Sequence, residues 1–264
     1  MNVLITGAAS GIGLAASEYF LKKGHTIYGI DAKGSEEREG FIGIVADVTD
    51  SEALSEIGNK LTESGVLLDV IVCVAGIHAM ASLVEDDYVK IKRVIDVNLL
   101  GTMAVCRVFH KHLVPKGRIV IVTSEVATYD PMPFNGLYTV SKTALDSYAQ
   151  ALRQELNLIG QRVITVRPGA VETPLAKESG NATAELAERT ELYRKQAKHF
   201  SHLVVRFTGK PMCPRCIAAL IHKAATKKRV RLDYSINRHP GLVLLSILPR
   251  RLQCFVIKTL LNRK

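Results

Sequence analysis

The amino-acid sequence predicts an α/β fold built on a doubly wound parallel sheet. Short runs rich in Val and Ile alternate with longer amphipathic segments, and those between the first six runs are mostly long enough to form helices. Parallel strands need such crossovers, whose right-handed connections place helices on both faces of the sheet. A glycine-rich turn directly after the first run is a third observation, because such turns commonly join a first strand to its helix.

Seven runs are predicted as strands because each is short, rich in β-branched residues and bounded by polar or turn-forming residues. The stretches between them supply the helices of a three-layer αβα arrangement. The predicted strands are residues 2–6 (NVLIT), 25–30 (HTIYGI), 41–46 (FIGIVA), 69–74 (DVIVCV), 118–123 (RIVIVT), 162–166 (RVITV) and 229–234 (RVRLDY).

A single domain is expected for most of the chain. The 264 residues, 47% of them hydrophobic, can bury one large α/β core, which we assign to residues 1–235. Within it, the long polar stretch at about 172–210 interrupts the strand–helix rhythm and is predicted to form a helical lid over a site. Residues 236–264 are predicted to form a basic, amphipathic C-terminal tail.

The chain is basic, with 35 Lys and Arg against 25 Asp and Glu and a net charge of +10. Such a charge fits a nucleic acid, an anionic membrane or a merely soluble surface. The sequence contains no aromatic-rich platform for single strands, no zinc-finger spacing and no other recognised nucleic-acid motif. We therefore expect no nucleic-acid partner.

Five cysteines are scattered through apolar segments, an odd number that favours reduced thiols over a disulfide framework. Cys213 and Cys216 have the spacing of a redox or metal pair, but no second pair of ligands accompanies them, so no metal site is predicted. Residues 1–7 resemble a buried strand rather than a secretory signal. These features predict a cytoplasmic protein.

The turn TGAASGIG contains Gly7, Gly11 and Gly13 and leads into an apolar-periodic helix. Glycine permits a positive φ and a close backbone approach to phosphate, and the helix N-terminus offers free N–H groups. The turn is therefore predicted to bind a pyrophosphate. Its spacing differs from the common GxGxxG pattern, so the turn alone could also be purely structural.

Asp31 ends the second predicted strand, at about the distance from the glycine turn where a carboxylate binds an adenosine ribose. Its charge would repel a 2′-phosphate, and Ser10 offers no positive charge to hold one. NAD is therefore expected rather than NADP. Taken alone, Asp31 could be an ordinary turn residue.

Tyr138 and Lys142 lie four residues apart, so a helix would place them on one face. A nearby ammonium favours the phenolate and would lower the tyrosine pKa from about 10, which suits a general acid or base. Spacing alone does not identify a site, because the same pairing also occurs at Tyr19 with Lys23 and at Tyr88 with Lys92.

These features together resemble the short-chain dehydrogenase/reductase family, in its compact single-domain Rossmann-fold branch. The resemblance extends from Met1 to about Tyr234 and depends on five motifs in order. They are TGAASGIG, ADVTD with Asp47, DVNLLG with Asn98, YTVSK with Tyr138 and Lys142, and RPGAVETP with Pro168, Val171 and Thr173.

The resemblance implies an NAD-dependent oxidoreductase that interconverts a secondary alcohol and a ketone or aldehyde. Tyr138 would exchange a proton with the substrate oxygen, while Lys142 would lower the Tyr138 pKa and hold the nicotinamide ribose. Asn98 would bind a water that continues the proton path. The implied cofactor-binding residues are Gly7, Ser10, Gly11, Ile12, Gly13, Asp31, Asp47, Val48, Ala75, Gly76, Tyr138, Lys142, Pro168, Val171 and Thr173.

The sequence departs from the family pattern in two places. Where the family usually has NNAG after the fourth strand, this chain has CVAG, so Cys73 and Val74 replace two amides that normally brace the sheet. The family's active-site serine often lies 13 residues before the tyrosine, a position that here is Glu125, with Ser124 one residue earlier. Because an ionised glutamate only accepts hydrogen bonds and would repel a developing alkoxide, we predict Ser124 as the catalytic residue.

The tail has an apolar run too short to span a bilayer, then a helix-like stretch flanked by basic residues. Its composition suits peripheral contact with an anionic membrane, or docking on the substrate entrance or a second subunit. An apolar, lipid-like or steroid-like substrate would accord with a membrane contact. The helix is predicted to carry on one face Leu252, Phe255, Val256, Thr259 and Leu260.

Two further expectations concern the assembly and the function of the protein. The resemblance implies a homodimer or homotetramer paired through the helices that carry Asn98 and Tyr138. The rival functions are a non-catalytic dinucleotide-binding sensor or scaffold, in which the altered motifs signal lost activity, and a membrane-interaction module whose working part is the tail.

Overall fold

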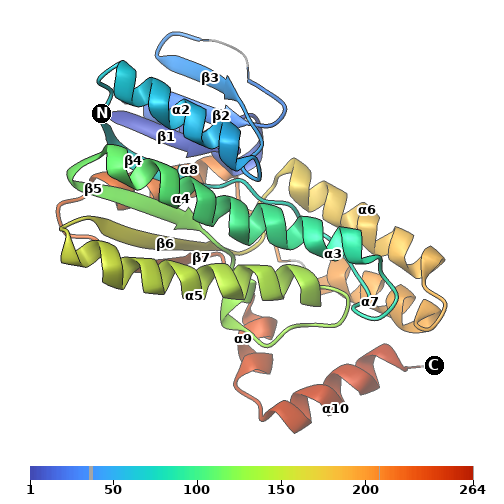
Figure 1. Ribbon diagram of the computed structural model, residues 1–264. Coiled ribbons are helices and arrows are strands. Elements are labelled where there is room, and N and C mark those ends of the chain that lie inside the picture. Colours follow the sequence, from blue (N-terminus) through green and yellow to red (C-terminus); the bar gives the residue numbers. More distant parts are fainter. Residues whose placement is uncertain (36–37, 208, 264) are drawn as a thin grey trace.

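The computed structural model describes the whole chain except residues 36–37, 208 and 264 (Figure 1). Its centre is a seven-stranded parallel sheet in the order β3-β2-β1-β4-β5-β6-β7, which confirms the predicted fold class. The order reverses between β1 and β4, the switch point beside which such sheets bind ligands. The strands are β1 (Asn2–Thr6), β2 (Thr26–Asp31), β3 (Phe41–Val45), β4 (Leu68–Cys73), β5 (Leu113–Val122), β6 (Arg162–Pro168) and β7 (Asp233–Ile236).

The last strand lies further along the chain than the sequence pattern predicts. Residues 229–232 precede the ladder instead of forming it, and Thr165 N donates a hydrogen bond to Leu232 O before the pairing of Val166 with Tyr234. The ladder then runs to Ile236, beside Pro168. The basic residues at 227–231 remain solvated in a turn, and this charge explains why the strand begins after them.

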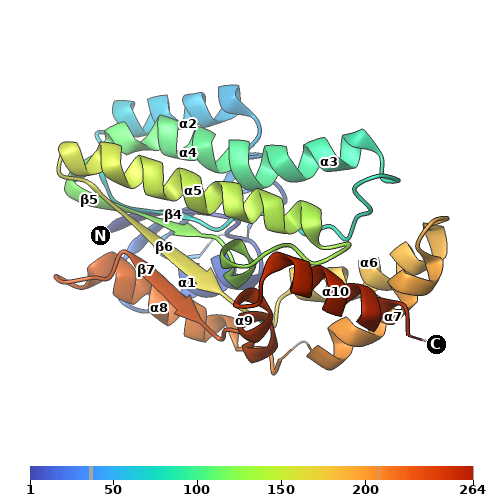
Figure 2. The ribbon, with the colours of Figure 1, turned by 90° about the horizontal axis from the view of Figure 1, so that it is seen from below.

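Helices cover both faces of the sheet, as Figure 2 shows from below. Along β1, Leu4 faces one layer while Val3 and Ile5 face the other, as strand alternation requires. The first layer consists of α2 (Ser51–Glu63), α4 (Thr102–Phe109) and α5 (Gly136–Leu158), and the second of α1 (Gly11–Leu21) and α8 (Pro214–Thr226). Before α4, α3 (Tyr88–Ile95) continues through a π-helical turn, Asp96–Gly101, and short 3-10 helices occupy His110–His112 and Glu125–Thr128.

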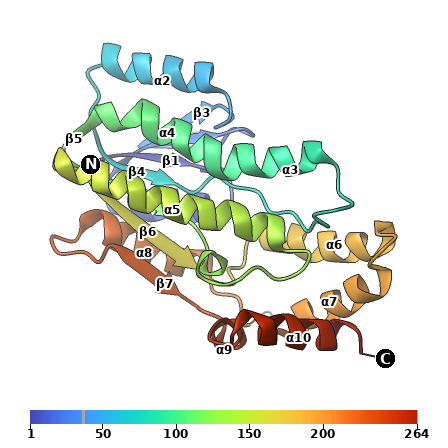
Figure 3. The same cartoon turned by 60° about the horizontal axis from the view of Figure 1, so that its bottom comes forward.

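The predicted helical insertion is present as a pair of helices, α6 (Pro174–Arg189) and α7 (Arg194–Phe207). They extend beyond the end of the sheet, at the right of Figure 3. A separate apolar cluster joins them to the loop before α5 through Phe134, Leu186 and Phe200. The position suits a lid, and that role remains a prediction.

The tail forms two helices, α9 (Pro240–Ser246) and α10 (Arg250–Leu261), which lie beside α7 at the lower edge of Figure 3. The face of α10 that is turned inward carries Gln253, Ile257 and Leu261, so the predicted apolar face is largely the outward one. None of the described helices is long and apolar enough to cross a membrane.

Candidate active site

The glycine turn joins β1 to α1 with a backbone that glycine makes possible. Gly7 and Gly11 have φ values of +70° and +52°, in the left-handed region. A Cβ on Gly13 would lie 1.9 Å from Gly7 O, so α1 packs directly on the turn. The side chain of Ser10 does not cap the helix, which leaves the first N–H groups, including that of Ile12, available to an anion. This geometry fits a pyrophosphate.

Asp31 lies beside the same turn. Its Oδ2 accepts a hydrogen bond from Ala9 N at 3.0 Å, and its Oδ1 accepts one from Lys33 N at 2.9 Å. The carboxylate therefore holds the end of β2 against the phosphate-binding backbone. A ribose hydroxyl group of a dinucleotide bound at the turn would contact the Asp31 carboxylate at this position.

Asp47 and Val48 follow β3. The carboxylate of Asp47 pairs with Arg93 at 2.9 Å and accepts hydrogen bonds from Thr49 N and Oγ1. Burial opposes ionisation here, but the bonds from Arg93 and Thr49 together outweigh it and lower the pKa of Asp47. Val48 is buried against Gly101 of the π-helical turn. The side chain of Asp47 is thus bound by protein partners, and its adenine contact remains a prediction.

The end of β4 is held by a hydroxyl group whose role the sequence pattern did not predict. The buried Thr6 hydroxyl accepts hydrogen bonds from Val74 N and Ala75 N, both at 3.2 Å. Cys73 turns away to Cys106, with sulfur atoms 3.9 Å apart, and this contact together with burial raises the Cys73 pKa. One hydroxyl from β1 therefore holds the main chain at the end of the CVAG sequence.

Asn98 is fully buried in the π-helical turn. Its Oδ1 accepts from Ile77 N at 2.8 Å, and its Nδ2 donates to Ile77 O and Ser141 Oγ, both at 2.9 Å. The side chain thus fixes the segment just after Gly76, where a Cβ would lie 3.1 Å from Oδ1. The predicted water contact would have to be made by the main chain of this turn, a geometry frequent at functional sites.

Lys142 is buried beneath this segment. Its Nζ donates to Val122 O at 3.4 Å and lies 5.9 Å from the centre of the Tyr138 ring. A Cβ on Gly76 would lie 3.3 Å from Nζ, so glycine leaves room beside the ammonium. Burial lowers the pKa of Lys142 to about 8 because no carboxylate compensates for the lost water.

The expected lowering of the Tyr138 pKa is not found in the protein without cofactor. Burial raises the pKa of Tyr138 to about 12, and the hydrogen bond of Ser124 lowers it only in part. Removal of the phenol from water therefore decides the direction of the shift, and Lys142, whose Nζ lies 5.9 Å from the ring centre, does not offset it.

The structure separates the two candidates for the active-site serine position. Ser124 is the residue whose side chain interacts with the Tyr138 phenol. Glu125 is buried and turned toward the tail, where its Oε2 accepts from His239 N at 2.7 Å and from the Tyr129 hydroxyl at 3.4 Å. The geometry therefore supports Ser124, and the catalytic role of Ser124 is still a prediction.

His78 lies at the candidate site, although no sequence pattern predicts a role for it. Its ring lies 4.4 Å from the Tyr138 ring, and its Nε2 is 3.0 Å from Asn135 Oδ1. Burial, with the charge of Lys142, lowers the pKa of His78 to about 4 against the effect of Asn135. A neutral imidazole thus packs on the phenol. Its position just after Ala75 and Gly76 was the only available clue.

The segment after β6 closes the opposite side of the glycine turn. Pro168 ends the strand, and Val171 forms a parallel bridge with Met212. Thr173 caps α6 through a bond from Ala176 N at 3.2 Å, and its methyl group lies near the position of a Cβ on Gly11. The turn and this segment thus approach each other.

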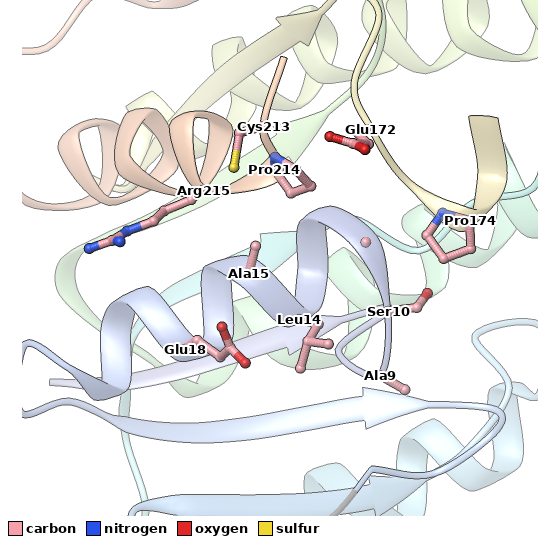
Figure 4. Close-up of a pocket in the computed structure, with 11 residues that line it drawn as sticks. Ala9, Ser10, Leu14, Ala15, Glu18, Glu172, Pro174, Cys213, Pro214 and Arg215 are labelled. Carbon is pink, nitrogen blue, oxygen red and sulfur yellow. The ribbon is translucent and has the colours of Figure 1, made fainter. Parts of the chain in front are cut away.

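An open depression of about 510 Å³ borders the glycine turn on its α8 side (Figure 4). It is lined by Ser10, Gly11, Glu172, Cys213 and Arg215, among others, and contains none of the predicted catalytic residues. It is therefore not the reaction centre. In the described part of the chain no group of three or more His, Cys, Asp or Glu side chains could hold a metal.

Comparison with known proteins places the chain in a family. A family model described as short chain dehydrogenase matches residues 1–184. The 3-ketodihydrosphingosine reductase of Bacteroides thetaiotaomicron is 25% identical over 228 residues, covering 86% of this chain and 84% of the relative. The NADPH-dependent 1-acyldihydroxyacetone phosphate reductase of Schizosaccharomyces pombe is 30% identical over 199 residues, covering 72% and 67%.

Solved structures give the same answer for the fold. A short chain dehydrogenase from Mycobacterium paratuberculosis, bound to NAD, superposes with a TM-score of 0.74 at 23% identity. The match covers 89% of this chain and 96% of that one. The chain belongs to the short-chain dehydrogenase/reductase family. It is therefore an oxidoreductase of the NAD(P)-binding kind that acts on a small molecule.

Proposed function

We propose that the protein is an NAD-dependent dehydrogenase/reductase that interconverts a secondary alcohol and a ketone or aldehyde, with Tyr138 as the general acid or base. The observation that carries this proposal is the grouping of Ser124, Tyr138 and Lys142 at the end of the sheet where the glycine turn lies. Asn98 holds the backbone of Ile77, just after Gly76.

The residues fit a dinucleotide. Gly13 lets the start of α1 pack directly on the backbone of Gly7, and Gly76 leaves space beside the Lys142 ammonium. The turn would hold the pyrophosphate, and Lys142 would bind the nicotinamide ribose. Bound NAD supplies the hydride acceptor, or NADH the donor.

The protein groups then manage the proton. Ser124 binds the substrate oxygen and orients it toward the phenol. With a pKa of about 12, Tyr138 is protonated at neutral pH and is ready to donate to the oxygen of a carbonyl substrate. In the oxidative direction, Lys142 stabilises the phenolate, because its charge acts across a medium that excludes water.

The proposal predicts that Tyr138→Phe removes turnover and leaves cofactor binding intact. The ring and its contact with His78 are kept, and only the proton-carrying oxygen is lost. We expect kcat to fall about 100-fold or more, with the Kd for NAD changed less than about twofold. The measurement is nicotinamide absorbance with a panel of alcohols and ketones, beside a titration of NAD. Cofactor binding with no Tyr138-dependent turnover on any substrate would favour the sensor or scaffold alternative.

NAD is preferred over NADP in this proposal because Asp31 stands beside the glycine turn. Asp31→Asn keeps an acceptor for Ala9 N and removes the charge, so affinity for NADP should rise relative to NAD by about tenfold. Glu63→Gln, at the far end of α2, is the control for a lost carboxylate. Titration of both cofactors measures the ratio of the two dissociation constants. An unchanged ratio would show that Asp31 does not set the cofactor preference.

An apolar substrate is the class that the surroundings favour. The loop before α5 and the helices α6 and α7 share an apolar cluster that includes Met80, Met132 and Phe134. One similar protein is named for a long-chain lipid substrate, 3-ketodihydrosphingosine. An apolar substrate is also consistent with a peripheral membrane contact of the tail.

A further inference from the structure

The C-terminal helices α9 and α10 take no part in the proposed reaction, yet they are held in place. Gln253 Nε2 donates to Asp130 Oδ2 at 3.1 Å, and Gln196 Nε2 on α7 donates to Asn262 Oδ1 at 2.7 Å. His199 Nδ1 lies 2.9 Å from Leu261 O. These contacts fix the rotation of α10, so that it has a defined outward face.

The outward face is apolar along its centre. Residues 252, 255 and 259 lie on one side of α10, opposite the residues that dock on α7. Position 244 on α9 and position 247, directly after that helix, are likewise exposed. The large apolar side chains exposed here are Leu244 (63%), Ile247 (72%), Leu252 (43%) and Phe255 (65%).

The charged side chains of the same C-terminal segment are all basic. From Tyr234 to the end, the chain contains no Asp or Glu. Arg250 pairs with Asp130 at 3.2 Å, whereas Arg251 and Lys258 are exposed and form no ion pair with any residue that the structure describes. Arg263 is exposed beyond the end of the helix. Long basic side chains around an apolar strip can reach lipid headgroups while the strip enters the acyl boundary.

We propose that α9 and α10 form a docking surface for an anionic phospholipid bilayer. Leu252 and Phe255 would enter the interface, with Arg251 and Lys258 at the level of the phosphates. A second copy of this chain fits the surface less well, because a two-fold contact would set one basic strip against another.

The contacts of the inner face of α10 indicate which part of the protein would lie next to the bilayer. Ile257 and Leu261 pack into the cluster that contains Phe134, in the loop before the helix of Tyr138. The bilayer would therefore lie next to the helical insertion and that loop. Delivery of a lipid-soluble substrate from the membrane rests on the proposed function, but the binding itself does not.

The test is sedimentation of the full chain with vesicles. One set is phosphatidylcholine alone, and the other is an equal mixture with phosphatidylglycerol. We expect binding to the mixture, weak binding to phosphatidylcholine, and release by added salt, since the attraction is partly electrostatic. Leu252→Ser with Phe255→Ser, and separately Arg251→Gln with Lys258→Gln, should each weaken binding to the mixture by about tenfold or more.

Matched controls lie elsewhere on the surface. Leu158→Ser removes an exposed apolar side chain from the end of α5, and Lys227→Gln with Lys228→Gln removes two exposed charges from the turn before β7. Both should bind vesicles as the unaltered chain does. Equal binding to both vesicle types, or equal loss in variants and controls, would overturn the proposal.

Two further readings separate the causes of failure. Circular dichroism and NAD titration show whether each variant is folded and whether the proposed cofactor site is intact. If Leu252→Ser with Phe255→Ser changes the mass of the protein in the absence of vesicles, the surface is a subunit contact and the membrane proposal is wrong.

Discussion

At the scale of single residues, the site holds an ammonium group away from water without an opposite charge. Lys142 is buried, and its Nζ has one long hydrogen bond, to Val122 O. Methionine has an aliphatic stem of similar length and no charge, so it would avoid the cost of burying an ammonium group. The cost of burial is therefore best understood as strain kept for function, as is common where stability and activity compete.

This cost predicts that Lys142→Met stabilises the protein without cofactor. Because the pKa of Lys142 is lowered from 10.5 to about 8, the folded state holds the charged form less well than the unfolded state. The destabilisation caused by burying the charged lysine is fully present below pH 8 and disappears as the pH rises toward 10.5. We expect a gain of about 1–3 kcal/mol in the free energy of unfolding at pH 7, with activity lost.

Denaturant unfolding at pH 7 and at pH 10 measures the effect. The gain should shrink at the higher pH, because the wild-type lysine is then largely neutral when folded. Lys60→Met, at an exposed position on α2, is the control for lysine-to-methionine replacement. A loss of stability at both pH values would show that Lys142 is structural.

At the scale of elements, one hydroxyl links two central strands at the switch point. Thr6, the last residue of β1, accepts from the main-chain N–H groups of Val74 and Ala75 just after β4. Thr6→Val keeps the shape but leaves both donors without this acceptor, so we expect a loss of about 1–3 kcal/mol in the free energy of unfolding. Affinity for NAD should fall as well, because Gly7 packs on Ala75.

The measurement pairs denaturant unfolding with NAD titration. Thr26→Val, at the start of β2, has the same chemistry in a less buried place and serves as the control. Equal stability of Thr6→Val and the control would mean that another group braces the end of β4.

The elements show what the sequence could predict and what it could not. Period and turn chemistry are local, so the fold class and the glycine turn followed from the pattern. The bounds followed less well, because β5 begins at Leu113, five residues before the predicted run, and β7 begins at Asp233, after the charges that precede it. The bracing by Thr6 and the turning of Glu125 toward His239 join residues 68 or more positions apart. Contacts of that kind depend on packing and leave no periodic trace in one sequence.

The pKa of Tyr138 shows the same limit. Spacing on a helix placed Lys142 near the phenol, as the 5.9 Å distance confirms. The direction of the pKa shift depends on how much water burial removes, which spacing cannot report. Likewise, His78 lies at the site because Asn135 and Tyr138, which are distant from it in the sequence, pack against it.

At the scale of the whole molecule, the layer of α4 and α5 leaves apolar residues uncovered. Leu100 and Val140 are half-exposed, and Met103 lies on the same layer. They belong to the π-helical turn, α5 and α4 respectively, the elements through which the family resemblance implies that subunits pair. Charged and polar groups usually replace such side chains on a surface that stays in water.

We therefore predict that this layer forms the subunit contact and that Met103→Glu weakens it. In a self-complementary interface the new carboxylate is present on both subunits, so its desolvation cost occurs twice in each contact. Sedimentation equilibrium should show a multimer for the unaltered chain and a shift toward monomer, by about tenfold or more in Kd, for the variant. Leu192→Glu adds the same charge at an exposed position between α6 and α7 and should leave the mass unchanged. Because α5 also carries Tyr138, loss of subunit pairing should lower kcat more than it alters NAD affinity. If the unaltered chain is a monomer, the proposed subunit contact is wrong.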